Sequence, residues 1–305
     1  MKRQVLVGSR GSALALAQAN EVIKTLSGCA PDLSCKVVAI KTKGDKPHES
    51  GESTIEGKSV FTKEIEDSLL KGDIQIAVHS MKDLTTDLPS ELTIAAVPPR
   101  ADHRDALISR NNRKFDELPG GARVGTSSPR RRTQLLATRS DLEIADMHGN
   151  VDTRLRKLDG GGYDAIVLAA AGLMRLGLEK RVTEFLSTKI MLPAIGQGAL
   201  AIEARKDDAE TLELVSHLED KSTHQAVEAE RAFARKLNAN CRTPIAAYAK
   251  VQDGKLAIEG MVSSTDGRML LRSQLVSEYV DPEKVGEELA ESLLRKGAQL
   301  VLEAE

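Results

Sequence analysis

The sequence has 305 residues but no tryptophan, and aromatic residues make up only 2% of it. Proteins that bind single-stranded nucleic acids stack the bases on aromatic side chains, so this class of protein is not expected. The basic excess that favours binding to a duplex is also missing, because 43 lysines and arginines face 45 aspartates and glutamates, for a net charge of −2. The composition therefore predicts no nucleic-acid partner.

Cysteines and long hydrophobic runs are scarce as well. The three cysteines (Cys29, Cys35 and Cys241) fit no zinc motif, which favours a reducing compartment and predicts no metal site. No run approaches the roughly 18 apolar residues that a membrane span needs. The N-terminus enters the strand-like segment Gln4–Val7 without the features of a signal peptide. We therefore expect a cytoplasmic protein with no membrane partner, and we expect a monomer.

An arginine-rich stretch, Gly125–Arg132, joins a strand-like segment to a predicted helix over Thr133–Arg139. Pro129 suits the first helical position, which makes Ser128 the N-cap. The three arginines then lie near the positive end of the helix dipole, where cations are disfavoured. With the free backbone N–H groups and the neighbouring hydroxyls they predict a bound anion. The alternative is three solvated arginines on a surface helix.

The same arrangement occurs near the start of the chain, which predicts an internal repeat. A strand over 4–7 leads through Gly8 to Ser12, the expected N-cap of a helix over 13–26. Segments 72–84 and 162–175 form a second pair, each with a glycine turn, a buried strand and polar residues. Two similar α/β units joined near Pro98 would bring polar strand ends to a cleft, the usual ligand site of open α/β sheets.

From about Asp220 the pattern changes to that of a small α+β domain. A helix is expected over 223–237, and three strands follow with hairpin turns at Asp253–Gly254 and Asp266–Gly267. Asp281–Pro282 then opens a last amphipathic helix that we expect to run to about Leu302.

One carboxylate stands out among the many cations at predicted strand ends. Asp83 could shuttle a proton or stabilise a developing cation, but it could equally be an N-cap or an ion-pair partner of Lys82 or an arginine. The cation of Arg242 favours a thiolate at Cys241, although a buried cysteine at a strand start is the simpler interpretation. Both His79 and His148 are more readily explained as hydrogen-bonded structural histidines than as catalysts. The polar residues at these ends are Arg10, Ser12, Lys82, Asp83, Ser127, Ser128, Arg130, Arg131, Arg154 and Arg175.

Taken together, the motifs resemble those of the porphobilinogen deaminase (hydroxymethylbilane synthase) family, in order and along the whole chain. The motifs are Arg10–Ser12 with Leu14–Gln18, His79–Asp83, Gly125–Arg131, Gly149–Leu155, Asp164–Leu173, Leu192–Gly198, and Cys241 with Pro244–Ile245.

The resemblance implies an enzyme that condenses four porphobilinogen molecules head to tail with loss of ammonia and releases linear 1-hydroxymethylbilane. It implies a dipyrromethane cofactor, held by a thioether to Cys241, as the primer. Asp83 matches the family's catalytic carboxylate, and the small-molecule partner is porphobilinogen. The matching cofactor-binding residues are Ser12, Lys82, Asp83, Thr126, Ser127, Ser128, Arg130, Arg131, Asn150, Arg154 and Cys241, and the matching substrate-binding residues are Arg10, Ser12, Gln18, Lys58, Arg154, Arg175 and Gln197.

The expected fold class is α/β, with two periplasmic-binding-protein-like α/β lobes around a cleft plus a smaller α+β C-terminal domain. We expect the first domain over 1–98 with a return segment over 196–215, the second over 99–195, and the cofactor-attachment domain over 216–305.

The chain departs from the family pattern at a few positions. His148 stands where an arginine is usual, which weakens one carboxylate contact or makes it depend on pH. Asn238–Asn240 replaces a glycine pair before Cys241, and Ser59 replaces a glycine after Lys58. The alternatives are a two-lobed protein that binds a small anion and a phosphate-handling transferase, for which the sequence has no phosphate-loop motif.

Overall fold

The computed structural model describes residues 3–42, 62–239, 243–278 and 281–303, which form two compact units. The first unit comprises Met1–Arg100 and Ala199–His224, and the second comprises Ala101–Gly198 and Gln225–Glu305. Each unit is described separately below.

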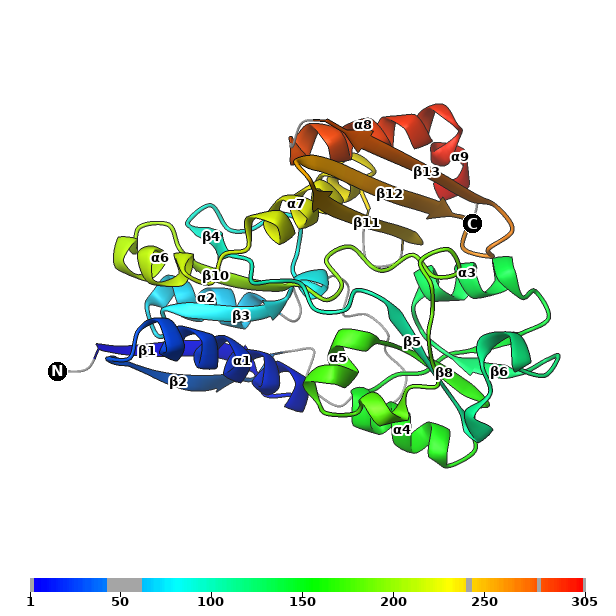
Figure 1. The fold of residues 1–305 in the computed structure, drawn as a ribbon, viewed down its shortest axis with the longest axis horizontal. Coiled ribbons are helices and arrows are strands. Elements are labelled where there is room, and N and C mark those ends of the chain that lie inside the picture. Colours follow the sequence, from blue (N-terminus) through cyan, green and yellow to red (C-terminus); the bar gives the residue numbers. More distant parts are fainter. Residues whose placement is uncertain (1–2, 43–61, 240–242, 279–280, 304–305) are drawn as a thin grey trace. The chain divides into compact units, whose positions relative to one another are not determined.

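The first unit is built on a five-stranded sheet with the order β2-β1-β3-β10-β4 (Figure 1). β1 is parallel to both β2 and β3, whereas β10 is antiparallel to β3 and β4. The predicted N-cap of α1 is confirmed, because the Ser12 hydroxyl accepts a hydrogen bond from the N–H of Ala15. The bounds are β1 (Arg3–Arg10), α1 (Ala13–Cys29), β2 (Leu33–Ile40), α2 (Lys63–Lys71), β3 (Ile76–Ser80), the 3₁₀ turn η3 (Met81–Asp83), β4 (Leu92–Ala96), β10 (Leu200–Arg205) and α6 (Ala209–Ser216).

The second unit contains a five-stranded sheet of the same design. Its order is β7-β6-β8-β5-β9, with β6 parallel to β7 and β8, and β5 antiparallel to β8 and β9. The bounds are β5 (Asp105–Ser109), η4 (Arg110–Asn112), η5 (Phe115–Glu117), β6 (Arg123–Gly125), α3 (Pro129–Thr138), β7 (Glu143–Ala145), α4 (Val151–Asp159), β8 (Ala165–Ala169), α5 (Ala170–Arg175), η6 (Glu179–Arg181) and β9 (Glu184–Phe185).

The predicted repeat is confirmed by the positions of these strands. β1 and β6, which both carry a Val-Gly pair, are the second strands of their sheets, and β3 and β8 are the third. A Cβ atom on Gly8 would meet Ile74, and one on Gly125 would lie 2.6 Å from the Met147 side chain. In both units, glycine therefore makes room for a neighbouring apolar side chain.

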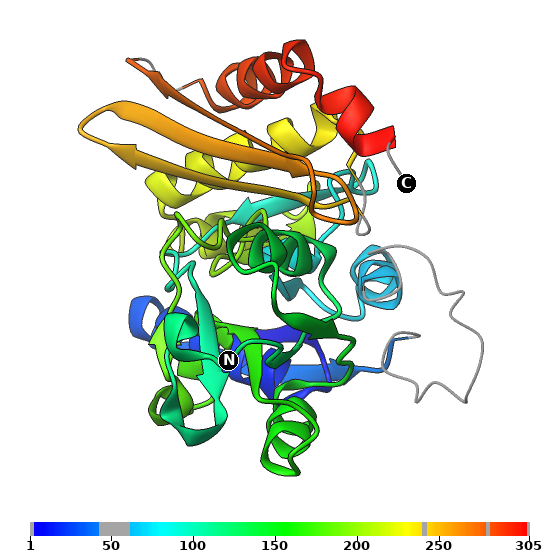
Figure 2. The same cartoon turned by 90° about the vertical axis from the view of Figure 1, so that its right-hand side faces the viewer.

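A three-stranded antiparallel sheet, β11-β12-β13, completes the second unit, and α8 lies over one face of it (Figure 2). A Cβ on Gly260 of β12 would lie 2.9 Å from both Phe233 of α7 and Leu289 of α8, so both helices pack on that face. Both predicted hairpin turns are confirmed. The bounds are α7 (Lys221–Lys236), β11 (Ile245–Gln252), β12 (Lys255–Ser263), β13 (Leu270–Ser277), α8 (Pro282–Arg295) and α9 (Ala298–Glu303).

The prediction of a single last helix that runs to about Leu302 is wrong. α8 ends at Arg295 and α9 begins at Ala298, because Gly297 between them adopts φ +93°, a left-handed conformation that ends a helix.

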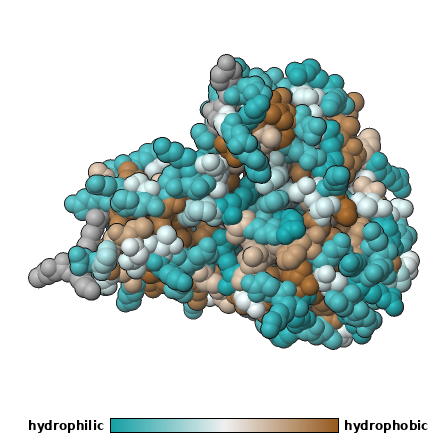
Figure 3. Space-filling view, in the orientation of Figure 1, coloured by the Kyte–Doolittle hydropathy of each residue, from teal (hydrophilic) through white to brown (hydrophobic). Residues whose placement is uncertain are grey.

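The α/β fold class with a smaller α+β domain is confirmed by the three sheets and their helices. The boundaries of the three expected domains stay predictions. In the part of the chain that the structure describes, no helix combines the length and apolar character needed to cross a bilayer. Hydrophilic residues cover most of the face drawn in Figure 3, with smaller hydrophobic areas between them.

A buried ion cluster attaches α3 to the sheet of the second unit. Asp105, the first residue of β5, is fully buried, and its Oδ2 accepts a hydrogen bond from Arg130 Nη1 at 2.8 Å. Its Oδ1 accepts from Arg131 Nε at 2.9 Å and from Nη2 at 2.7 Å. The two guanidiniums also donate to the carbonyls of Leu192 and Val167.

Two of the three arginines are therefore not solvated on a surface helix. Arg130 and Arg131 are each 6% exposed, and only Arg132 is exposed to solvent. Burial works against an ionised Asp105, but the charges and hydrogen bonds of the two arginines hold the pKa of its carboxyl well below the usual range. Because one carboxylate faces two guanidiniums, the cluster keeps one excess positive charge beside the first turn of α3.

We predict that Asp105→Asn destabilises the protein by about 3–5 kcal/mol, because two buried cations lose their counter-charge. Since the folded-state pKa is depressed, the stabilisation is present above pH ~4 and is lost as the pH falls below that value. Denaturant unfolding at pH 7 measures the change. Asp152→Asn is the matched control, because Asp152 forms an exposed pair with Arg156 that is worth at most about 1 kcal/mol. Equal losses in the two variants would show that the cluster does not hold α3 in place.

Candidate active site

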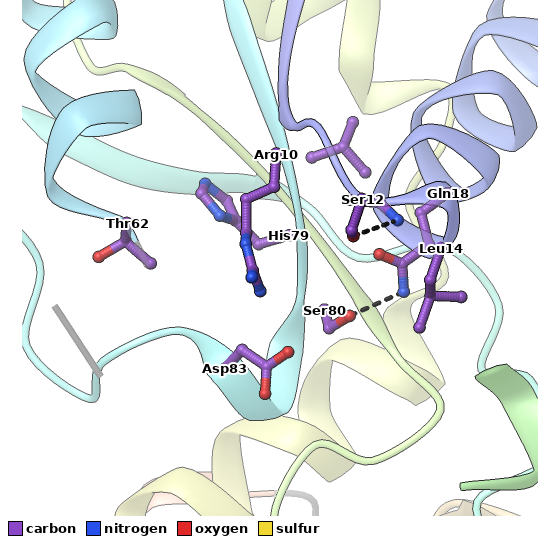
Figure 4. Close-up of a pocket in the computed structure, with 10 residues that line it drawn as sticks. Arg10, Ser12, Leu14, Gln18, Thr62, His79, Ser80 and Asp83 are labelled. Carbon is purple, nitrogen blue, oxygen red and sulfur yellow. Dashed lines mark hydrogen bonds between the residues drawn. The ribbon is translucent and has the colours of Figure 1, made fainter. Parts of the chain in front are cut away.

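The first unit has a pocket at the carboxyl ends of its parallel strands β1 and β3 (Figure 4). It encloses about 420 Å³ of empty space, part of it open to solvent. Four residues predicted for the site line it together, namely Arg10, Ser12, Gln18 and Asp83. The predicted grouping of polar strand ends is therefore present within this unit.

Arg10 and Asp83 point toward one another across this pocket in Figure 4. Asp83 is half-buried at the end of η3, directly after β3, and Lys82 beside it is also half-buried. Gln18 is buried and donates to the Ser80 hydroxyl at 2.7 Å. The pocket thus combines one carboxylate and one guanidinium with hydrogen-bonding groups held in fixed positions.

His79 lines the same pocket and has a buried acid behind it. Its Nε2 lies 3.0 Å from Oε2 of Glu203 on β10, and the two side chains are almost completely buried. The preferred interpretation of His79 as a hydrogen-bonded histidine is confirmed. Sequence reasoning missed Glu203, although an acid inside the apolar strand Leu200–Arg205 was a usable signal.

In the second unit, three hydroxyl groups precede α3 and organise the loop. The Thr126 hydroxyl accepts from the N–H of Ser128, and the Ser128 hydroxyl accepts from the N–H of Arg131, which confirms Ser128 as the N-cap. Ser127 Oγ accepts from the N–H of Met147. A hydroxyl oxygen that accepts a backbone hydrogen bond still has its own proton to donate. The loop can therefore present O–H donors to an anion.

His148 shares this loop through a 3.2 Å contact between its Nε2 and Ser127 Oγ. It is exposed, and its backbone carbonyl accepts from Lys157. The imidazole therefore lies beside one of the predicted cofactor-binding hydroxyls, although the side chain is shorter than the arginine that is usual there.

Arg154 on α4 is the least compensated cation of this group. Its Nε donates to the carbonyl of Gly149 at 2.8 Å, and no carboxylate of a described residue forms an ion pair with it. Burial and the charge of Arg131 lower the pKa of its guanidinium to about 10. An anionic ligand near Arg154 would relieve both effects.

The other predicted residues of the second unit have structural partners. Asn150 caps α4 by accepting from the N–H of Thr153. Gln197 is fully buried and donates to the carbonyl of His103 at 2.9 Å, while Arg175 is half-buried and donates to the carbonyl of Gly198. Two further predicted residues, Lys58 and Cys241, lie outside the described residues.

The similarity of this chain to known proteins is evidence independent of the site geometry. Residues 5–213 match the family model described as "Porphobilinogen deaminase, dipyromethane cofactor binding domain", and residues 224–295 match "Porphobilinogen deaminase, C-terminal domain". Among solved structures, the methionine binding protein MetQ is similar over 73% of this chain and 92% of its own, at 15% identity and a TM-score of 0.44. A likeness at that level carries no argument.

Two curated relatives match nearly the full chain. The porphobilinogen deaminase of Syntrophotalea carbinolica is 49% identical over 98% of this chain and 95% of its own length. The porphobilinogen deaminase of Carboxydothermus hydrogenoformans is 47% identical over 99% of this chain and 97% of its own. With both domain models matched in order and these identities over almost every residue, the chain belongs to the porphobilinogen deaminase family.

Proposed function

We propose that this protein is a hydroxymethylbilane synthase, a transferase of tetrapyrrole biosynthesis that condenses four porphobilinogen molecules head to tail. Each condensation releases ammonia, and the linear product, 1-hydroxymethylbilane, leaves by hydrolysis. Family membership supports this reaction and does not favour the alternative of a small-anion binding protein. The observation in the structure that carries the proposal is the excess positive charge of the half-buried Arg154 and of the buried Asp105 cluster.

The described residues fit a dipyrromethane cofactor. Each pyrrole ring of this group carries two carboxylates, so its site needs fixed cations and donors. The second unit has them in Arg154 with its lowered pKa, in the excess charge of Arg130 and Arg131 over Asp105, and in the hydroxyl of Ser128. When bound through a thioether to Cys241, dipyrromethane would supply the pyrrole carbon to which the first new unit is joined.

We infer different tasks for the residues of the first unit. Arg10 holds a carboxylate of porphobilinogen, and the Ser12 hydroxyl, which accepts from Ala15, keeps its proton free to donate to the same ligand. Asp83 accepts hydrogen bonds from pyrrole N–H groups and stabilises the positive charge that develops as ammonia leaves. Gln18 belongs to the polar lining and is assigned to substrate binding, and Lys82, next to Asp83 in the chain, is assigned to cofactor binding.

The remaining assignments are part of the same proposal. We assign Thr126, Ser127 and Asn150 to cofactor binding, and Lys58, Arg175 and Gln197 to substrate binding. The three domains would have the boundaries given above, with a monomeric protein acting in the cytoplasm.

Cys241→Ser tests the proposal most directly. We expect the purified wild-type protein to be heavier than its sequence by one dipyrromethane, and we expect the variant to have the bare sequence mass and no turnover, because the un-ionised serine hydroxyl is a much weaker nucleophile than a thiolate. Intact mass spectrometry and hydroxymethylbilane formation are the measurements. Cys35→Ser is the control and should keep the adduct. Full activity without an adduct would falsify the assignment of Cys241.

Asp83→Ala should fold and retain the cofactor but lower kcat by roughly 10²–10³-fold, because the developing positive charge loses the one carboxylate among the described residues that line the pocket. Steady-state kinetics with porphobilinogen measures the effect. Asp87→Ala removes an exposed acid four residues away and should leave kcat within about twofold of wild type. Near-normal kcat in the Asp83 variant would remove this carboxylate from the mechanism.

Arg154→Gln should weaken binding without weakening the fold. Because burial already disfavours the charged guanidinium, its removal should leave the melting temperature unchanged or higher, whereas a lost charge-assisted hydrogen bond should weaken ligand binding about 10–100-fold. Cofactor occupancy and KM are the readouts. Arg156→Gln changes an exposed arginine on the same helix and should alter neither. A lower melting temperature with unchanged cofactor occupancy and KM would make Arg154 structural.

A further inference from the structure

A buried cluster of titratable groups lies beneath the pocket of the first unit and has no part in the proposed mechanism. It consists of Glu66 on α2, His79 on β3 and Glu203 on β10. All three are buried, with Glu66 8%, His79 6% and Glu203 0% exposed. Two acids so close to an anion-binding pocket would oppose its function if both were ionised.

Each carboxyl of this cluster has one oxygen without a hydrogen-bond partner among the described residues. The two atoms are Oε1 of Glu66 and Oε1 of Glu203. The other oxygen of Glu203 is 3.0 Å from Nε2 of His79. Because a carboxylate is only an acceptor, two ionised carboxylates cannot satisfy one another, and each bare oxygen would cost several kcal/mol in the interior.

Among the described neighbours, the buried Thr62 hydroxyl is the one group that can donate to Glu66, and a single hydroxyl proton cannot satisfy both bare oxygens. On α2, the half-buried Glu64 and the exposed Asp67 are both acids. Arg205 on β10 donates instead to the carbonyl of Leu69 and to Asp208. Burial is the largest influence on the Glu66 carboxyl and raises its pKa. The Thr62 hydroxyl opposes this rise, the nearby charge of Glu203 adds to it, and the smaller effect of His79 lowers the pKa.

We propose that Glu66 stays protonated at neutral pH and that its Oε1–H donates to Oε1 of Glu203. This single hydrogen bond would satisfy both unpartnered oxygens at once. The Nε2–H of His79 then donates to the other oxygen of the ionised Glu203. The cluster therefore forms one continuous chain of hydrogen bonds and carries one negative charge fewer than two ionised acids would.

The consequence for substrate rests on the proposed function. Thr62, the first residue before α2, and His79 both line the pocket that contains Arg10. A second negative charge below this pocket would reduce the attraction between Arg10 and a porphobilinogen carboxylate. Glu66 is thus a positioning residue, and its proton keeps the floor of the pocket suited to an anion.

Stability as a function of pH tests the shared proton without reference to catalysis. A carboxyl whose pKa is raised by folding contributes stability that is lost as the pH rises through the folded-state pKa. Glutamine has an N–H₂ group that can replace the proton at every pH. The melting temperature of Glu66→Gln minus that of wild type should therefore increase between pH 5 and pH 9, while the same difference for the control Asp67→Asn should stay constant. A difference that is flat or falls for Glu66→Gln overturns the proposal.

Infrared spectroscopy of the wild-type protein covers the case in which Glu66→Gln does not fold. A buried protonated carboxyl should give a C=O stretching band at pH 7 that persists in Asp67→Asn. Absence of the band in wild type overturns the proposal.

The role in the pocket is tested by the pH dependence of KM for porphobilinogen. KM of the wild-type enzyme should rise at alkaline pH more steeply than KM of Glu66→Gln, with kcat of the two proteins following the same profile. Parallel KM profiles would overturn the role in the pocket even if the stability result holds. A wild-type protein that does not turn over porphobilinogen would instead count against the proposed function.

Discussion

The second unit depends on a buried cluster in which two positive charges share one negative charge. A single fully buried carboxylate, Asp105, holds two guanidiniums that are themselves almost fully buried. Removing charges from water is costly unless they are paired, so this cluster fixes the start of α3 against β5. The two arginines share this one carboxylate, and no carboxylate of a described residue forms an ion pair with the nearby Arg154. Among its described residues, the second unit therefore has more positive than negative charge around the start of α3.

The two sheets share a design but differ in the chemistry at their strand ends. In both units a Val-Gly strand leads to a serine that caps a helix while keeping its own proton to donate. The first unit adds an acid, Asp83, and a hydrogen-bonded histidine, whereas the second adds arginines and hydroxyls. Two sheets of the same design thus carry different polar groups at their strand ends.

Much of this could be predicted from the sequence because its signals are local. The caps Ser12 and Ser128, the hairpin glycines and the paired Val-Gly strands depend on neighbouring residues only. The partners of Arg130 and Arg131 could not be predicted in the same way, because Asp105 is distant in sequence and pairing requires the tertiary fold. An acid that opens the apolar strand Asp105–Ser109 was the available hint. Inside β10, Glu203 was likewise visible but could not be matched to its histidine.

The position of β10 has a consequence for how the chain is assembled during translation. β10 separates β3 from β4, and β4 pairs with no other strand of its sheet. All five strands of the second sheet, from β5 to β9, are synthesised before β10 leaves the ribosome. The sheet of the first unit therefore cannot be completed until β10 has been made. Until then the edge of β3 stays unpaired, although the sheet of the second unit can already form. During this interval the unpaired edge is accessible to chaperones. A chain whose synthesis stops there would be prone to aggregate through that edge.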